Sequence, residues 1–244
     1  KSIIILLALS LCHLKIICQV SGIYKTEEYV SLLKNKNVAV VVNQASVIYD
    51  QHLVDTLINR GVDVEYFESK IPENKIQILK NELKIDISKK IILYPARLTN
   101  WKGQLEFLDV FKKMRNENLS LYFVGDTKNY SYSRKLQDKI NNLNLSNNCK
   151  IFGNMSKESL KILYQLSTVI VSFPLQAEGF GRIISEALVM EKKILAFNYG
   201  GVKDQIQNLD DIYKVEPHKY EDIYFKLKNI ININDETYSN ISTF

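Results

Sequence analysis

The chain has 244 residues, of which 46% are hydrophobic and 24% charged, with a formal net charge of +5. This size allows one large domain or two small ones with a sizeable core, and the 9 glycines and 4 prolines exclude a fibrous or low-complexity protein. Lysines are spread along the chain and form no block. We therefore expect a solvated surface and no nucleic-acid partner, while the mild basic excess also suits an anionic substrate or peripheral contact with an anionic membrane.

Cysteine and histidine positions indicate neither a metal site nor a disulfide framework. Cys12, Cys18 and Cys149 lack the spacing of metal ligands, and the three histidines are isolated. No Asp-x-Asp triplet occurs. We therefore expect no metal and no cofactor.

The first part of the chain, taken in order, predicts a leader and one small β-α-β unit. Lys1 precedes a short apolar run, so residues 1–22 resemble a secretory signal, with a buried strand or helix as the alternative. We expect a helix over 23–36, a strand over 38–42, a helix over 52–59 and an extended segment over 62–67.

From residue 73 onward, helix and strand patterns alternate. We expect helices over 73–83, 103–114, 132–143, 156–165 and 182–190, and strands over 90–94, 119–124, 150–152, 168–173 and 193–197. Repeated strand–helix units of this length predict an α/β fold with a Rossmann-like, doubly wound parallel sheet over about residues 88–215. Ligands of such a sheet bind at the carboxyl ends of its strands.

Cations and glycines lie at these predicted strand ends. Arg97 follows the strand 90–94, and Lys102 opens the next helix, so both can reach an anion at that helix N-terminus. A planar guanidinium and a compact ammonium together suit a diphosphate. Gly125 and Gly153 end the next two strands and allow a ligand to approach the backbone.

Two carboxylates follow the strand 168–173. We expect Glu178 in a glycine-loosened loop and Glu186 a little over two turns into the next helix, facing one crevice. Each feature alone is common on a solvated surface. Their order at successive strand ends makes the hypothesis of a ligand site specific.

Five ordered motifs resemble the C-terminal, nucleotide-sugar-binding half of retaining GT-B glycosyltransferases of the family 4 type. The resemblance runs from about residue 60 to the end of the chain. The matching segments are 96–104 (ARLTNWKGQ), 123–126 (FVGD), 152–155 (FGNM), 177–181 (AEGFG) with Glu186 and Ala187, and 198–202 (NYGGV).

The resemblance implies roles for the matching residues. Arg97 and Lys102 are expected to hold the donor diphosphate and stabilise the leaving nucleoside diphosphate. Glu178 is expected to face the donor sugar and Glu186 the ribose, and the amides of residues 179–181 (Gly179, Phe180, Gly181) to touch sugar and phosphate.

Residues 23–67 resemble a different family, the secreted peptidoglycan exo-β-N-acetylmuramidases. The similar segments are 26–29 (TEEY), 32–46 (LLKNKNVAVVVNQAS) and 52–57 (HLVDTL). That family continues into a Pro-Glu-His-Gly segment with active-site chemistry, whereas here Phe67 is followed by 68–72 (ESKIP). No hydrolase site is therefore transferred, and the stretch 60–67, which suits both families, suggests a chimera.

These resemblances give the expected organisation: a leader over 1–22, a muramidase-like fragment over 23–67 and a nucleotide-sugar-binding domain over 68–244. We expect glycosyl transfer with retention to a glycan or lipid-linked acceptor, impaired by the missing acceptor domain, in the cytoplasm or at a membrane periphery. The alternatives are a secreted muramidase fragment and a non-catalytic nucleotide-sugar-binding module.

Overall fold

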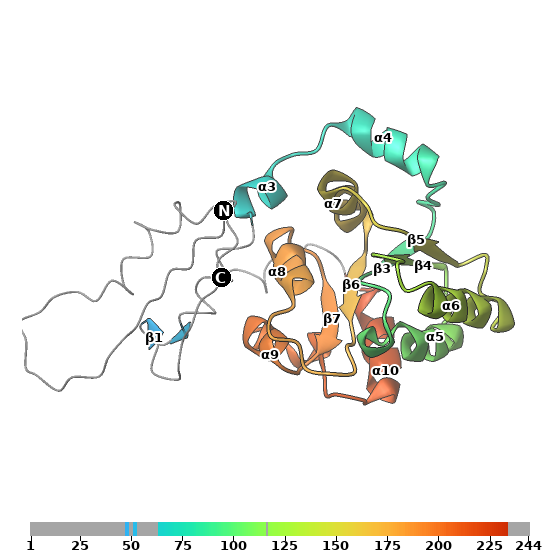
Figure 1. The fold of residues 1–244 in the computed structure, drawn as a ribbon. Coiled ribbons are helices and arrows are strands. Elements are labelled where there is room, and N and C mark those ends of the chain that lie inside the picture. Colours follow the sequence, from blue (N-terminus) through green and yellow to red (C-terminus); the bar gives the residue numbers. More distant parts are fainter. Residues whose placement is uncertain (1–46, 49–50, 53–62, 116, 234–244) are drawn as a thin grey trace, which may run out of the picture. The chain divides into compact units, whose positions relative to one another are not determined.

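The computed structural model describes residues 47–48, 51–52, 63–115 and 117–233 (Figure 1). The chain divides into two units, Lys1–Asp63 and Val64–Phe244. In the first unit, β1 (Val47–Ile48) and β2 (Gln51–His52) pair as an antiparallel ladder. The helix expected to begin at His52 is wrong there, because His52 pairs with Val47. β-branched Val47 and Ile48 favour the extended conformation, and the ladder satisfies their backbone groups. The leader, the helix 23–36 and the strand 38–42 lie outside the described residues.

The second unit contains a parallel sheet whose described strands follow the order β5-β4-β3-β6-β7-β8. The central strand β3 pairs with β4 on one side and with β6 on the other. The inner strands β4, β3, β6 and β7 are buried almost throughout, as a parallel sheet covered on both faces requires, whereas the edge strands β5 and β8 are half-buried. Their bounds are β3 (Lys90–Pro95), β4 (Leu119–Val124), β5 (Cys149–Phe152), β6 (Val169–Ser172), β7 (Ile194–Phe197) and β8 (Lys214–Val215).

Helices connect these strands and cover both faces of the sheet (Figure 1). Right-handed crossovers place α5 and α6 on one face and α7, α8 and α9 on the other, and α10, which follows β8, packs against α5. The bounds are α4 (Glu73–Glu82), α5 (Gln104–Lys113), α6 (Tyr130–Asn142), α7 (Lys157–Leu166), α8 (Arg182–Val189), α9 (Gly201–Ile206) and α10 (Tyr220–Ile230), with 3-10 turns η2 (Asn100–Lys102) and η3 (Asp211–Tyr213).

The doubly wound parallel sheet predicted from the sequence is confirmed. Each strand and helix expected between residues 73 and 197 is present within a few residues of its predicted bounds. The predicted serine cap of α7 is also present, since Ser156 Oγ accepts a hydrogen bond from the Ser159 amide at 3.0 Å. Among the described residues, no helix is long and apolar enough to cross a lipid bilayer.

The extended segment expected over 62–67 is wrong, because Val64–Glu68 forms the short helix α3. The apolar residues of this segment suggested a strand, but the described side chain of Phe67 packs against a helix. The ring of Phe67 is buried and lies edge-on to the ring of Tyr164 in α7, with centroids 6.3 Å apart. Lys161 of α7 donates to the carbonyl oxygens of Tyr66 and Ser69 at the C-terminal end of α3. A lysine at this end satisfies free carbonyls and favours the helix dipole.

Candidate functional site

The candidate site lies where the strand order reverses. From β3 the chain proceeds outward through β4 to β5, and then returns to β6 on the other side of β3. The loops after β3 and β6 therefore lie side by side at the carboxyl ends of the two strands, where a sheet of this kind forms its ligand-binding crevice. Arg97 and Lys102 follow β3, and Glu178 follows β6, so the fold brings these predicted residues to the two loops that flank this crevice.

The hydroxyl of Tyr94 joins these two loops. It accepts a hydrogen bond from the Phe173 amide at 3.0 Å and donates to the Lys102 carbonyl. Gly103, which has φ +76°, brings the backbones closer still, because a Cβ there would lie 2.0 Å from the Phe173 oxygen. The Leu175 amide also donates to the Trp101 carbonyl at 2.7 Å. The backbone around Lys102 is thus fixed by the loop that leads to Glu178.

Lys102 and Glu178 form an ion pair between these two loops. Lys102 Nζ donates to Glu178 Oε1, and the side chains are 14% and 13% exposed. The ammonium also lies 4.2 Å from the centroid of the Trp101 ring, whose face attracts a cation. A cation and a carboxylate that have lost most of their water therefore stand side by side where β3 and β6 end.

Arg97 is held by its backbone and leaves its side chain exposed. Its carbonyl accepts a hydrogen bond at 3.0 Å from Nε2 of Gln104, a fully buried side chain whose Oε1 accepts at 2.9 Å from the hydroxyl of Tyr132. Among the described residues, no acceptor is bonded to the guanidinium of Arg97. This side chain is available to an anionic ligand.

The loop after β7 supports the glutamate loop from the other side. The Gly201 amide donates to the Glu178 carbonyl at 2.8 Å. A Cβ on Gly200, which has φ +57°, would lie 2.5 Å from that carbonyl oxygen, and one on Gly201 would lie 2.0 Å from the Gly179 oxygen. The paired glycines of segment 198–202 thus serve loop packing.

The remaining predicted donor-binding residues lie at other strand ends and at the start of α8. Gly125 follows β4, and its amide donates to the Phe152 carbonyl at 3.3 Å, while the exposed Gly153 follows β5. Gly179 is exposed, Phe180 is half-buried, and Gly181 is the N-cap of α8. All of these residues lie at the carboxyl edge of the sheet, as predicted.

Glu186 lies nearer the start of its helix than expected. Helix α8 begins at Arg182, as predicted, and Glu186 is four residues further on, so Glu186 lies about one turn from the N-terminus and the expected two turns were wrong. The hydroxyl of Tyr164 donates to Glu186 Oε2 at 3.0 Å. Burial raises the pKa of Glu186, while this hydrogen bond and the charges of Arg182 and Lys157 act in the opposite direction.

Sequence reasoning missed four side chains that shape the site: Tyr94, Trp101, Gln104 and Tyr164. The two tyrosines carried a usable signal, because each is a polar aromatic within an apolar run, and a buried hydroxyl requires a partner. Trp101 and Gln104 lie in the matching segment 96–104, but their contacts are made across loops and could not be predicted from it.

Comparison with known proteins identifies the family. The family model described as Glycosyl transferases group 1 matches residues 75–243. The chain belongs to this family. The resemblance inferred from the five motifs is therefore confirmed, whereas the muramidase-like segment 23–67 lies outside the matched range and stays a prediction.

Individual relatives agree with the family assignment. Trehalose synthase of Thermococcus litoralis is 25% identical over 174 residues, which cover 67% of this chain and 40% of that protein. Lipopolysaccharide 1,2-N-acetylglucosaminetransferase of Salmonella typhimurium is 24% identical over 157 residues, which cover 61% of this chain and 40% of that protein. The chain thus spans about 40% of the length of these curated relatives.

Solved structures share the fold. A glycosyltransferase of Rickettsia africae superposes with a TM-score of 0.68 and 27% identity, covering 92% of this chain and 62% of that one. Anabaena HepE in complex with UDP-glucose has a TM-score of 0.64 and 19% identity, covering 91% of this chain and 61% of that one. The second unit therefore has the Rossmann-like fold found in GT-B glycosyltransferases.

Proposed function

We propose that this chain binds a nucleotide-diphosphate sugar in the crevice between the ends of β3 and β6. The observation that carries the proposal is the Lys102–Glu178 pair, which places a cation for the diphosphate and a carboxylate for the sugar hydroxyls in direct contact. Family membership supplies the class of ligand. UDP-glucose, the ligand of the Anabaena neighbour, is a suitable first probe.

The proposed chemistry follows the charges that develop when a sugar–diphosphate bond breaks. Negative charge builds on the leaving diphosphate. The ammonium of Lys102 and the exposed guanidinium of Arg97 are cations on one loop that can stabilise this charge. Tyr94 and Gly103 fix the backbone of this loop, so the backbone that carries these cations needs little reorganisation when the nucleotide sugar binds.

Glu178 and Glu186 are proposed to read opposite ends of the donor. Glu178 lies beside Lys102, the cation proposed to bind the diphosphate, and is assigned to the sugar hydroxyls. Glu186 in α8 is assigned to the ribose. The amides of residues 179–181 lie between the two carboxylates in the chain and are assigned to the sugar and phosphate.

Transfer with retention to a glycan or lipid-linked acceptor is the proposed activity of the complete protein. The cytoplasm is its proposed location, because the family resemblance implies donors that are made there. A turnover assay with UDP-glucose and an added acceptor separates transfer from binding alone. A binding module without catalysis would retain donor affinity and release no UDP.

Calorimetric titration with UDP and UDP-glucose tests donor binding. Glu178→Gln should leave UDP affinity nearly intact and weaken UDP-glucose, whereas Glu186→Gln should weaken both ligands, since both contain ribose. Glu221→Gln is a matched control, because Glu221 pairs with Lys113 on the exposed surface, and it should change neither affinity. If wild-type protein binds neither ligand, or if Glu178→Gln weakens UDP as much as UDP-glucose, the assignment fails.

A further inference from the structure

The hydroxyl of Tyr164 is a buried polar group that the proposed donor contacts leave unused. Tyr164 is fully buried in α7, and its hydroxyl lies 3.0 Å from Glu186 Oε2 and 3.5 Å from the Ile183 carbonyl oxygen. Both acceptors belong to α8. Within the described part of the chain, the carboxylate of Glu186 receives its hydrogen bond from this hydroxyl.

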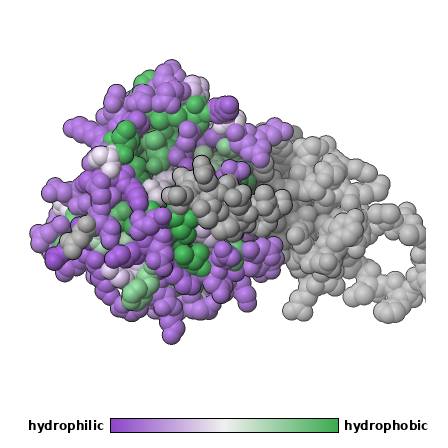
Figure 2. All heavy atoms as spheres, turned by 180° about the vertical axis from the view of Figure 1, so that it is seen from behind, coloured by the Kyte–Doolittle hydropathy of each residue, from purple (hydrophilic) through white to green (hydrophobic). Residues whose placement is uncertain are grey.

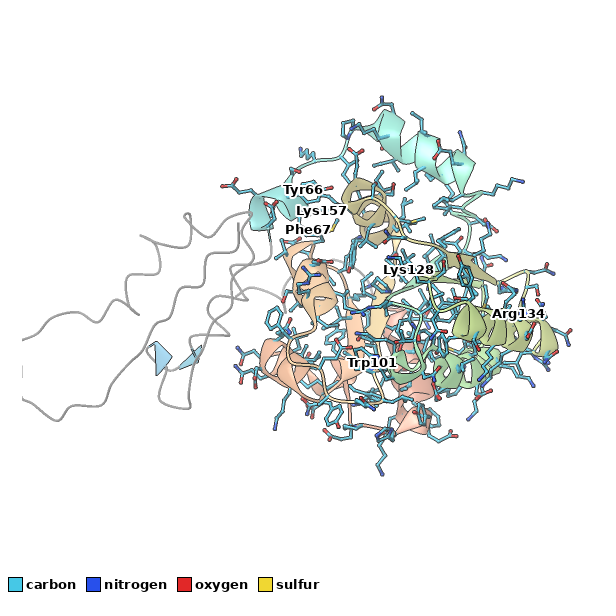
Figure 3. The ribbon with its side chains drawn as sticks, viewed as in Figure 1. Tyr66, Phe67, Trp101, Lys128, Arg134 and Lys157 are labelled. Carbon is cyan, nitrogen blue, oxygen red and sulfur yellow. The ribbon has the colours of Figure 1, made fainter. Side chains whose placement is uncertain are left out.

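The ring that carries this hydroxyl is fixed from the side of α3. The Phe67 ring meets it edge-on, with an interplanar angle of 89°. Lys157, the first residue of α7, lies 4.0 Å from the centroid of Tyr66 and 5.5 Å from that of Phe67, and the three labelled side chains lie together where α3 meets α7 (Figure 3). Helices α3, α7 and α8 thus converge on one tyrosine.

A carboxylate bonded through one oxygen can no longer rotate freely. Because Tyr164 binds Oε2, the plane of the Glu186 carboxylate is fixed and Oε1 remains to accept another donor. Among the described residues Glu186 Oε1 has no hydrogen-bond partner, and it is not buried. A diol such as the ribose of a nucleotide offers hydroxyl donors of the required kind.

We propose that Tyr164 is a positioning residue for nucleoside recognition, whose hydroxyl holds Oε2 of Glu186 so that Oε1 can accept from the ribose hydroxyls. This inference rests on the proposed function, in which Glu186 reads the ribose. The new element is that Tyr164 of α7 orients the Glu186 carboxylate without contacting the nucleotide sugar itself.

Tyr164→Phe removes the hydroxyl and keeps the ring that packs on Phe67, so the variant should fold. We expect its affinity for UDP to fall roughly 3- to 10-fold, because the carboxylate must then be ordered on binding. Affinity for inorganic pyrophosphate, which lacks ribose, should not change. In a Glu186→Gln background, the same substitution should have no further effect on UDP.

The pH profile gives a second readout that a purely structural role would not move. The charged groups that face Glu186 are Arg182 on its own helix and Lys157 on α7, and both remain in the variant. Loss of the hydroxyl donor should raise the pKa of Glu186 further. UDP affinity should therefore begin to fall at a higher pH in Tyr164→Phe than in the wild type as the solution is acidified.

Tyr122→Phe is the matched control, since Tyr122 is a buried tyrosine of β4 whose hydroxyl faces Ser120 and Asp86. It should leave UDP affinity unchanged. Unchanged UDP affinity in Tyr164→Phe, or an equal loss for UDP and pyrophosphate, would overturn the role of Tyr164. Failure of the wild-type protein to bind UDP would instead contradict the donor site itself, so the two failures are distinguishable.

Discussion

Replacing Lys102 by methionine separates the structural role of this residue from its role in binding. The ammonium is one half of an ion pair whose side chains are 14% and 13% exposed. Methionine keeps much of the aliphatic stem and removes the charge. Glu178 is then left as a largely buried carboxylate without its partner, which is unfavourable because its hydration has already been lost.

The size of the effect follows from the burial of the pair. Loss of one partner of a charge-assisted hydrogen bond costs about 1.5–3 kcal/mol. For a chain of this length, 2 kcal/mol corresponds to a fall of roughly 4–8 °C in the unfolding temperature. If Lys102 also contacts the diphosphate, UDP affinity should fall by the same free energy, which is roughly 10- to 150-fold.

The double variant Lys102→Met/Glu178→Gln distinguishes the two roles. Neutralising the unpaired Glu178 carboxylate should recover most of the predicted fall in unfolding temperature. UDP affinity should stay low because the cation is still missing. Lys113→Met is the control, since Lys113 pairs with Glu221 at an exposed position, where an ion pair contributes about 0–1 kcal/mol. Calorimetry and thermal unfolding measure both quantities. UDP affinity that recovers together with stability would refute the reasoning.

Three further predictions concern single positions. Gly103→Ala should destabilise the fold by about 1–3 kcal/mol in urea unfolding and weaken UDP binding, because φ there is +76° and the new Cβ would meet the Phe173 oxygen. Burial raises the pKa of Glu186 above 4.5, so near this pH the native state binds more protons than the unfolded state. The free energy of unfolding therefore falls as the pH rises from 4.5 through the native pKa, and Glu186→Gln should flatten this part of the curve. Burial also raises the pKa of the Cys149 thiol, so iodoacetamide should label Cys149 only after denaturant is added, as peptide mass spectrometry can show.

Regular local patterns explain why most of the sheet could be predicted. The strand at Leu119–Val124 is a buried run closed by a glycine, and α7 has its serine cap and apolar stripe, so each can be recognised from neighbouring residues alone. The segment before residue 68 could not, because its alternating pattern suits a strand and its helical form depends on Tyr164 and Lys161, which lie far along the chain.

The candidate site was likewise predictable only in part. The strand-end positions of Arg97, Lys102 and Glu178 follow from the element order. Contacts that cross between elements were not accessible from sequence, notably the pairing of Lys102 with Glu178 and the bond from Tyr164 to Glu186. These contacts depend on where helices and loops meet after packing.

The described part of the second unit also has a cavity that is separate from the candidate site. Hydrophilic side chains predominate on the face seen in Figure 2, with smaller hydrophobic areas between them. A cavity of about 670 Å³ lies away from the strand ends, lined by residues of α3, α7 and the end of α8. Its buried cation, Lys161, is already bonded to Tyr66 and Ser69.

A crystal structure of the protein with UDP-glucose would show directly whether the donor binds between Lys102 and Glu178. We expect the diphosphate at the start of α5, within hydrogen-bond distance of Lys102 Nζ, with a hexose hydroxyl on Glu178 and a ribose hydroxyl on Glu186. Donor density at the carboxyl ends of β3 and β6 in that orientation would support the site. Donor bound in the cavity beside Lys161, or with its ribose at Glu178, would contradict it.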